Sequence, residues 1–428
     1  MTAPLRIGIA GLGTVGAGVL RILQAQGDLI AARAGRPIEA VAVSARDRAK
    51  DRGVPLDAHA WEADPVALAR RPDIDVFVEV MGGHEGAAKA ATEAALAAGH
   101  DVVTANKAML AHHGQALALA AEEAGRVLRF EAAVAGGIPV IKALTEGLAG
   151  NRMTRVMGVM NGTCNYILTR MEEAGLPYAE VFEEARQLGY LEADPRLDVD
   201  GIDAGHKLSL LAAIAFGTQV AFDHVELEGI GSVTIEDIRR AADMGFKIKL
   251  LGVAQMTGRG LEQRMRPCLV PATSPLGQLQ GGTNMVVLEG DSVGQVVLRG
   301  AGAGAGPTAS AVLSDLIDIA RGNRVPTFGQ PAATLARARP AKGAVPAPHY
   351  LRLRLVDKPG ALAKVARVLG DSGISIDRMR QYGHEEGSAP VLIVTHKTTR
   401  AALDEALAAL PETGVVEGAP VAIRIEAV

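Results

Sequence analysis

Residues 5–16, with the sequence LRIGIAGLGTVG, combine an apolar run with three glycines in the spacing GxGxxG. The run predicts a buried strand, and the glycines lie where that strand would turn into a helix. The first glycine allows the tight turn, the second lets the backbone approach a pyrophosphate, and the third lets helix and strand pack closely. The N-terminus of the helix would then face the phosphates. We therefore predict a dinucleotide-binding turn that consists of Gly11, Gly13, Thr14, Val15 and Gly16.

The chain that follows this turn alternates short Val- and Ile-rich runs with Ala-rich helical stretches as far as residue 135. The expected strands are residues 5–10, 38–44, 76–80, 101–104 and 127–131, with helices at 85–98 and 114–124 among them. This alternation is typical of a parallel sheet with helices on both faces. It favours nucleotide binding over an ordinary tight turn of an α/β protein. The predicted fold class is α/β, with a Rossmann-type doubly wound parallel sheet.

The pattern changes after residue 135, where helices become longer and strands more widely spaced. Strands are expected at residues 155–160, 249–255 and 293–299, which predicts an α+β domain over 136–330. Residues 331–348 are rich in Pro and Ala without a period, which predicts a semi-extended linker. From 349 to 428 the order strand, helix, strand, strand, helix, strand predicts a small ferredoxin-like module. Together with the predicted nucleotide-binding domain at residues 1–135, these segments predict three domains and one linker.

The composition excludes several classes of function. The net charge of -4 is dispersed, which gives no electrostatic footprint for nucleic acid. Cys164 and Cys268 are the only two cysteines, too few for a disulfide framework, which favours a reducing compartment. The sequence has neither a cleavable signal pattern nor an apolar run long enough to span a bilayer. We expect a cytoplasmic protein without nucleic-acid or membrane partners.

The end of the second expected strand bears on the choice of cofactor. An acidic residue about 20 positions after the glycines usually binds the ribose of NAD. Here Ser44 ends the strand, and Arg46 and Arg48 follow it. The missing acid and the two arginines favour NADP, whose 2′-phosphate Arg46 would bind. NAD remains the alternative, because both arginines are also what a solvated loop would carry.

Three charged residues lie where chemistry is expected. Lys107 follows the fourth strand, at the sheet edge where α/β proteins bind ligands, although a solvated lysine at a helix start would look the same. If residues 202–216 form a helix, Asp203 and Lys207 lie one turn apart on one face. Most such pairs are surface salt bridges, but the many leucines here predict a buried helix, in which charges need partners. A lysine held by carboxylates can move the proton while hydride goes to a nicotinamide.

Five segments resemble the homoserine dehydrogenase family. They are VEVMGG at 78–83, TANK at 104–107, FEAAVAGGIP at 130–139, NGTCNYIL at 161–168 and LGYLEADPRLDVDGIDAGHK at 188–207. The resemblance implies nicotinamide-dependent interconversion of L-homoserine and L-aspartate 4-semialdehyde, in threonine, methionine and isoleucine biosynthesis. It also implies that residues 136–330 bind the substrate and dimerise. The competing hypotheses are a dehydrogenase for a related hydroxy or amino acid and a non-catalytic, amino-acid-responsive regulator.

The same resemblance implies the roles of single residues. Lys107 and Lys207 are the implied catalytic lysines, with Lys207 as the proton donor to the developing alkoxide. The implied substrate-binding residues are Gly162, Thr163, Glu192, Asp198 and Asp203, with Asp198 orienting a lysine. Thr104, Lys107 and Gly304 are implied to lie near the cofactor. The sequence departs from the family at Leu191, where a smaller residue is expected, and at Ser44, where many members carry a cation.

Two further sites are implied by resemblance. The segment from Glu131 resembles the family's monovalent-cation site, in which the carbonyls of Val134, Gly136 and Ile138 would bind sodium. Without the resemblance this segment would be a turn into a helix. Residues 356–376 resemble an ACT domain, a type of module that senses amino acids, with threonine as the implied effector. The alternative is a domain that only supports a homodimer or homotetramer.

Overall fold

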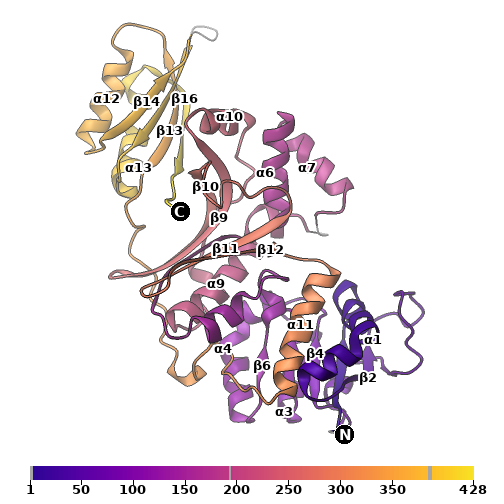
Figure 1. The fold of residues 1–428 in the computed structure, drawn as a ribbon. Coiled ribbons are helices and arrows are strands. Elements are labelled where there is room, and N and C mark those ends of the chain that lie inside the picture. The colour runs from indigo at the N-terminus through magenta and orange to yellow at the C-terminus, as the bar shows by residue number, and fades with distance from the viewer. Residues whose placement is uncertain (1–2, 192–193, 384–387) are drawn as a thin grey trace.

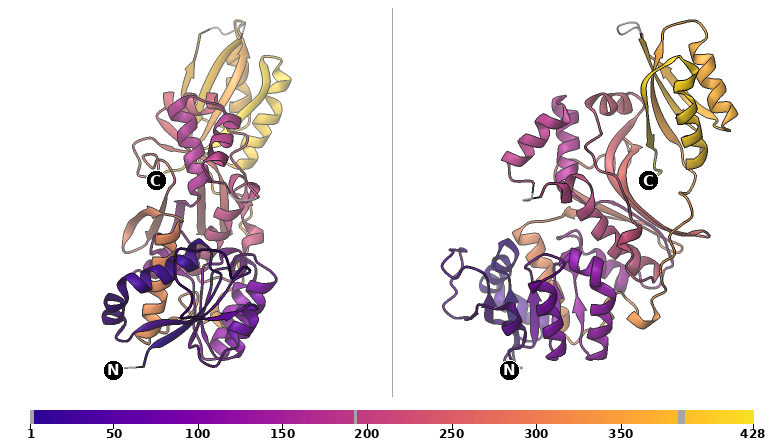
Figure 2. Two further views of the ribbon diagram at one scale, coloured as in Figure 1. Left: turned by 90° about the vertical axis from the view of Figure 1, so that its right-hand side faces the viewer. Right: turned by 180° about the vertical axis from the view of Figure 1, so that it is seen from behind.

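The computed structural model describes residues 3–191, 194–383 and 388–428. Figure 1 shows three regions in a row, with the N-terminal sheet at one end, a second sheet in the middle and the C-terminal module at the far end. Figure 2 shows the same succession from two other sides. The part of the chain that is described contains no helix long and apolar enough to cross a bilayer. Cys164 and Cys268 are both buried and free.

The N-terminal sheet is parallel and has the strand order β3-β2-β1-β4-β5-β6. Its strands are β1 (Leu5–Ala10), β2 (Ile38–Ser44), β3 (Ala60–Glu62), β4 (Val76–Glu79), β5 (Asp101–Thr104) and β6 (Leu128–Arg129). Its helices are α1 (Thr14–Ala34), α2 (Pro65–Ala69), α3 (Ala87–Ala97) and α4 (Lys107–Glu123). The order reverses between β1 and β4, which places a ligand crevice beside the phosphate-binding turn. The predicted Rossmann-type sheet is confirmed.

Apolar residues on both faces of this sheet explain why helices cover both of its sides. In β4, Val76 and Val78 belong to one core and Phe77 to the other, because successive side chains of a strand alternate. The first core also contains Val312 of α11 (Ala305–Ala320), which packs on α1. Figure 1 shows α11 beside α1 and β4. This helix returns to the first domain from beyond residue 300, so the domain limits that we propose from sequence order divide a core that is continuous in space.

The central region is a mixed sheet with the strand order β12-β11-β7-β9-β10-β8. Its strands are β7 (Met153–Val159), β8 (Glu226–Leu227), β9 (Phe246–Thr257), β10 (Gly260–Pro271), β11 (Thr283–Gly290) and β12 (Gly294–Ala301). The helices of this region are α5 (Val140–Lys142), α6 (Gly162–Ala174), α7 (Tyr178–Gln187), α8 (Arg196–Val199), α9 (Ile202–Phe216) and α10 (Ile235–Asp243). The α+β prediction is confirmed, and the sequence had indicated three of these six strands.

The C-terminal module has the order β13 (His349–Val356), α12 (Ala361–Asp371), β14 (Ile376–Gln381), β15 (Ser388–Thr395), α13 (Arg400–Ala409) and β16 (Val416–Arg424). Its antiparallel sheet, β14-β15-β13-β16, carries a separate apolar core. The ferredoxin-like prediction is confirmed. Before this module, residues 331–348 contain a 3₁₀ turn at Ala332–Thr334 and no further helix or strand. They lie on the protein, with bridges from Ala336 to Thr218 and from Pro340 to Leu261.

Candidate functional site

A cleft of about 740 Å³ lies between the N-terminal sheet and the central region. It contains most of the residues that the sequence singled out. The predicted residues that line it are Thr14, Val15, Lys107, Gly136, Gly162, Thr163, Asp198, Asp203, Lys207 and Gly304. They come from segments far apart in the sequence, and the fold brings them to one place. Glu192 lies outside the described residues.

The glycine turn forms the end of the cleft where α1 begins. Gly11 has φ +101°, and a Cβ there would be 2.6 Å from the Val80 carbonyl oxygen. A Cβ on Gly16 would be 2.0 Å from the Gly11 carbonyl oxygen, which explains why helix and turn need glycine. A Cβ on Gly13 would meet no protein atom within 4 Å. The second glycine therefore faces open space at the N-terminus of α1, as close approach of a pyrophosphate requires.

Glu79 fixes the ends of the two strands beside the cleft. Its carboxylate is fully buried and accepts hydrogen bonds from the Thr104 hydroxyl at 2.6 Å and the Met81 amide at 2.7 Å. Burial raises the pKa of Glu79. The Thr104 hydroxyl accepts from the Asn106 amide at 3.0 Å, and Lys107 begins α4 next to it. Thr104 is itself fully buried, so its side chain holds the strand ends that present Lys107 to the cleft.

Asp203 joins the two lysines of the cleft. One carboxylate oxygen lies 2.9 Å from Nζ of Lys107, and the other accepts from Nζ of Lys207 at 2.6 Å. Lys207 also donates to the Met160 carbonyl at 2.8 Å. Burial alone would raise the pKa of Asp203, but the charges of Lys207 and Lys107 hold it well below its ordinary value. The carboxylate is therefore ionised at neutral pH and is shared by two ammonium groups.

The opposite wall of the cleft is set by the start of α6. The Asn161 side chain accepts from the Cys164 amide at 2.8 Å, which caps the helix, and donates to Asp198 Oδ1 at 2.8 Å. The Thr163 hydroxyl donates to the Tyr190 carbonyl at 2.9 Å. These bonds connect the start of α6 to α8 and to the segment around Tyr190, and they fix two of the implied substrate-binding residues, Thr163 and Asp198.

The loop after β2 carries the arginines considered for the 2′-phosphate. Arg46 is exposed there, and Ser44 is buried at the strand end. Arg52, which no sequence pattern singled out, donates from Nε to the Leu12 carbonyl at 3.1 Å. The guanidinium groups of Arg48 and Arg52 each lie 5.8 Å from the ring centre of Trp61. Arg52 thus ties this basic loop to the glycine turn.

The expected cation segment begins with a buried carboxylate. Glu131 accepts from the amides of Ile141 at 3.0 Å and Lys142 at 2.8 Å, and burial together with Asp315 raises its pKa to about 8. The turn that follows is left-handed at Ala135, with φ +55°. Within the described ranges, no three His, Cys, Asp or Glu side chains are grouped as metal ligands. A site made of main-chain carbonyls would not require such a group.

Comparison with known proteins identifies the family. The sequence matches the NAD-binding domain of homoserine dehydrogenase over residues 11–131, homoserine dehydrogenase over 139–317 and the ACT domain over 349–412. It is 42% identical to the homoserine dehydrogenase of Neisseria gonorrhoeae over 431 residues, which cover 99% of each chain. The chain belongs to the homoserine dehydrogenase family.

Solved homoserine dehydrogenases share this architecture. The enzyme of Thiobacillus denitrificans gives a TM-score of 0.93 at 40% identity, with 99% of each chain covered. A hyperthermophilic archaeal homoserine dehydrogenase in complex with NADPH gives 0.64 at 27% identity, with 74% of this chain and 97% of that chain covered. Homoserine dehydrogenases are oxidoreductases, so the enzyme class, the dinucleotide-binding domain and the ACT domain expected from the sequence are confirmed.

Two residues of the cleft, Asn161 and Asn284, were not predicted as site residues from the sequence. Asn161 was part of a quoted motif, but its link to Asp198 depends on how α6 and α8 pack. Asn284 lies on β11 and lines the cleft, and its buried amide oxygen has no hydrogen-bond partner among the described residues. No local pattern marks Asn284, which only the fold brings to the site.

Proposed function

We propose that the cleft interconverts L-homoserine and L-aspartate 4-semialdehyde, with Lys207 moving the proton and NADP as the preferred nucleotide. The observation that carries this proposal is the Lys107–Asp203–Lys207 cluster, which lies in the same cleft as the glycine turn. A bound nicotinamide supplies the hydride chemistry. The chain then needs a group that moves a proton at the reacting oxygen, and a fixed lysine is suited to that task.

The hydrogen bonds of Lys207 leave it one donor for the substrate. An ammonium group has three N–H bonds. Two of them are directed to Met160 and Asp203, so the third can reach the substrate oxygen. In the reductive direction Lys207 donates this proton to the developing alkoxide, and in the oxidative direction the neutral amine takes it from the hydroxyl. Lys107 stands on the other side of Asp203 and adds positive charge near the developing oxyanion.

The other residues of the cleft suit the carboxylate and ammonium groups of an amino acid. The N-terminus of α6, at Gly162 and Thr163, offers main-chain N–H groups and a positive dipole end for the substrate carboxylate. Asp198 provides a carboxylate for the ammonium group or for orienting a lysine. Glu192 is proposed for the same ammonium group. Asn284 adds an amide oxygen that a ligand N–H can satisfy.

The nucleotide and cation proposals rest on the loops at the edge of the first sheet. Arg46, with Arg52 beside the glycine turn, is proposed to bind the 2′-phosphate of NADP, which the NADPH complex of the archaeal relative supports. Sodium is proposed at the carbonyls of Val134, Gly136 and Ile138. The left-handed turn at Ala135 and Gly136 suits carbonyls that converge on a cation, and Glu131 would hold this loop through its two amide contacts.

The proposal also includes the location, pathway, assembly and regulation of the enzyme. It would act in the cytoplasm, in threonine, methionine and isoleucine biosynthesis, as a homodimer or homotetramer. Its ACT domain would bind threonine near residues 357–362 and inhibit the reaction. The match over residues 349–412 supports the presence of the domain, and the effector and the oligomer are inferred from the family resemblance.

Purified protein should reduce NADP in the presence of L-homoserine, more efficiently than NAD. Lys207→Ala should lose nearly all turnover and still bind nucleotide. Lys89→Ala is the matched control, because Lys89 forms the same i,i+4 ion pair with Glu93 on α3, outside the cleft. No activity with homoserine, together with turnover of another alcohol, would contradict the proposed substrate. Wild-type activity of Lys207→Ala would contradict the role of Lys207. Threonine added to the same assay tests the proposed inhibition.

A further inference from the structure

Lys249 is a buried lysine that the proposed reaction does not use. It lies on β9, is 4% exposed, and forms no ion pair among the residues that the structure describes. Burial lowers the pKa of Lys249 to about 8, although the charge of Glu172 opposes this shift. Glu172 itself pairs with Lys247. Lysine is almost never buried without a paired charge, so the contacts of this ammonium group require an explanation.

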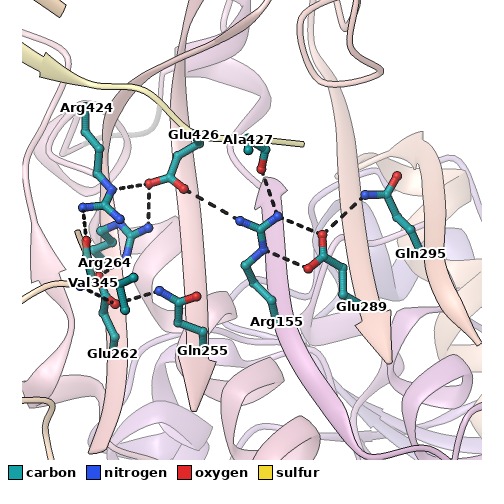
Figure 3. A network of polar contacts seen from close by, with 10 residues as sticks. All are labelled: Arg155, Gln255, Glu262, Arg264, Glu289, Gln295, Val345, Arg424, Glu426 and Ala427. Atoms are coloured by element: carbon teal, nitrogen blue, oxygen red, sulfur yellow. Dashed lines mark hydrogen bonds and ion pairs between the residues drawn. The ribbon is translucent and has the colours of Figure 1, made fainter. Parts of the chain in front are cut away.

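The polar side chains at the other end of the same strand have ordinary partners. Gln255, on the same face of β9, donates to Glu262 at 2.7 Å. Figure 3 shows this pair within a network of acids and arginines, in which Arg155 pairs with Glu289. Lys249 instead donates to two uncharged groups. It therefore does not neutralise an acid, and the location of its acceptors indicates its role.

The acceptors of Lys249 lie on two segments that form one wall of the cleft. Its Nζ donates at 2.9 Å to Oδ1 of Asn165, near the start of α6. It also donates to the carbonyl of Leu279, in the loop between β10 and β11. Asn165 in turn donates from Nδ2 to the Gly281 carbonyl at 2.7 Å. Lys249 and Asn165 thus fasten this loop to the start of α6.

The last residue of the loop, Gly282, lines the cleft together with Gly162 and Thr163 of α6. A Cβ on Gly162 would be 2.5 Å from the Gly282 carbonyl oxygen, so the loop packs closely on the helix start. A Cβ on Gly282 would be 3.4 Å from the ring of Tyr190, which also lines the cleft. Adjacent glycines have more conformational freedom than other residues. The pair Gly281–Gly282 therefore depends on hydrogen bonds from its surroundings to keep its place.

We propose that Lys249 is a positioning residue for the substrate. It holds residues 279–282 against the start of α6 and so sets the wall that receives the carboxylate of homoserine. This inference rests on the proposed reaction, which assigns the N-terminus of α6 to that carboxylate. Lys249 is not among the residues that line the cleft, so it acts through the wall and does not touch the substrate. The glycine turn and Lys207 lie on other elements, so nucleotide binding and proton transfer should change little.

Lys249→Met removes the ammonium group and keeps an unbranched, adaptable side chain in the buried position. KM for homoserine should rise by about 10-fold, the effect of one lost hydrogen bond to a charged group. Because only binding of the amino acid is weakened, kcat and KM for NADP should stay near their wild-type values. Lys247→Met is the matched control: Lys247 lies on the same strand and pairs with Glu172 of α6 instead of the loop. Its KM for homoserine should equal that of the wild type.

Asn165→Asp separates positioning of the loop from general stability. The new carboxylate still accepts from Lys249, but the N–H group that Gly281 accepts is lost. KM for homoserine should therefore rise in this variant too. A measurement without substrate completes the test: hydrogen–deuterium exchange of a peptide that covers residues 272–284 should be faster in Lys249→Met than in the wild type or in Lys247→Met.

The proposal is wrong if folded Lys249→Met keeps the wild-type KM for homoserine, if kcat and both KM values change in parallel, or if exchange in the loop is unchanged. If Lys249→Met does not fold, Asn165→Asp decides, and a wild-type KM in that variant overturns the proposal. Failure of the proposed reaction would look different. The wild type itself would then not oxidise homoserine, whereas exchange in the loop would still respond to Lys249→Met.

Discussion

Asp203→Asn is the sharpest test of the lysine cluster. The amide replaces a carboxylate that accepts from Lys107 and Lys207, at 2.9 and 2.6 Å. An amide has only one oxygen, so its NH₂ group must face one of the two ammonium groups. The loss of one charge-assisted hydrogen bond costs about 1.5–3 kcal/mol of stability. One lysine also loses the carboxylate that balanced its charge. The Lys107 side chain is 31% exposed, so solvent screens part of this cost.

The catalytic effect should exceed the structural one. A positioned proton-transfer group contributes about 10²–10⁴-fold to a rate, and Asp203 is one of only two groups that the described structure shows orienting Lys207. We expect kcat for homoserine oxidation to fall about 10²-fold, with nucleotide affinity nearly unchanged. The assay is NADPH formation at saturating homoserine, combined with a nucleotide titration monitored by fluorescence.

The pH dependence of the unfolding free energy provides a second test of Asp203→Asn. Because the pKa of Asp203 is depressed in the folded state, its stabilising effect is complete above its ordinary value of 3.8 and is lost as the pH falls below it. Wild type and variant should therefore differ in unfolding free energy at pH 7 and converge in acid. Glu93→Gln on α3 is the control, because it breaks a lysine pair outside the cleft. If Asp203→Asn keeps a kcat close to that of the wild type, the reasoning is refuted.

Three other changes test separate parts of the structure. Gly16→Ala places a Cβ 2.0 Å from the Gly11 carbonyl oxygen, so it should destabilise the protein by at least about 2 kcal/mol in urea unfolding and abolish nucleotide binding. Arg46→Ala should raise KM for NADP about 10-fold and leave KM for NAD nearly unchanged; equal effects on both would contradict a 2′-phosphate contact. Lowering of the pKa of His349 by burial from 6.5 to about 4 predicts that stability is full above pH 6.5 and falls by about 1.4 kcal/mol per unit toward pH 4. His349→Asn should make the urea midpoint less dependent on pH in that range, and an unchanged slope would show that the histidine is not responsible.

Local patterns were sufficient for five of the six strands of the N-terminal sheet, and the short edge strand β3 was not predicted. Alternating runs and the GxGxxG turn are properties of neighbouring residues, and β1, β2, β4 and β5 begin and end close to where the sequence placed them. The return of α11 to this domain could not be found in the same way. Its apolar face matches that of any buried helix, and its partner α1 lies far away in the sequence. Strands β10 and β11 were also missed, because buried strands of a mixed sheet lack a clear alternation of polar and apolar residues.

The site residues likewise fall into two groups, those that local patterns indicated and those whose contacts depend on packing. Lys107 was located by the end of a strand, and Asp203 and Lys207 by their spacing of four residues, which the helix α9 bears out. That Asp203 joins both lysines depends on the approach of α4 to α9, which no local pattern reports. Glu79 is a similar case. A single acid at a strand end looks like a ligand, whereas here it is buried and holds Thr104.

The position of Asp203 between two lysines makes the chemistry depend on how the two regions pack. Lys107 begins α4 in the N-terminal domain, while Asp203 and Lys207 belong to α9 in the central region, so the ion pair of Lys107 with Asp203 crosses the boundary. Next to it, the rings of His112 on α4 and His206 on α9 lie 5.6 Å apart. A relative shift that separates these helices would lengthen and weaken the ion pair, because its strength falls with distance. The proposed catalytic cluster is thus complete only when both regions are in place, so the proton transfer that we propose for Lys207 depends on how they pack.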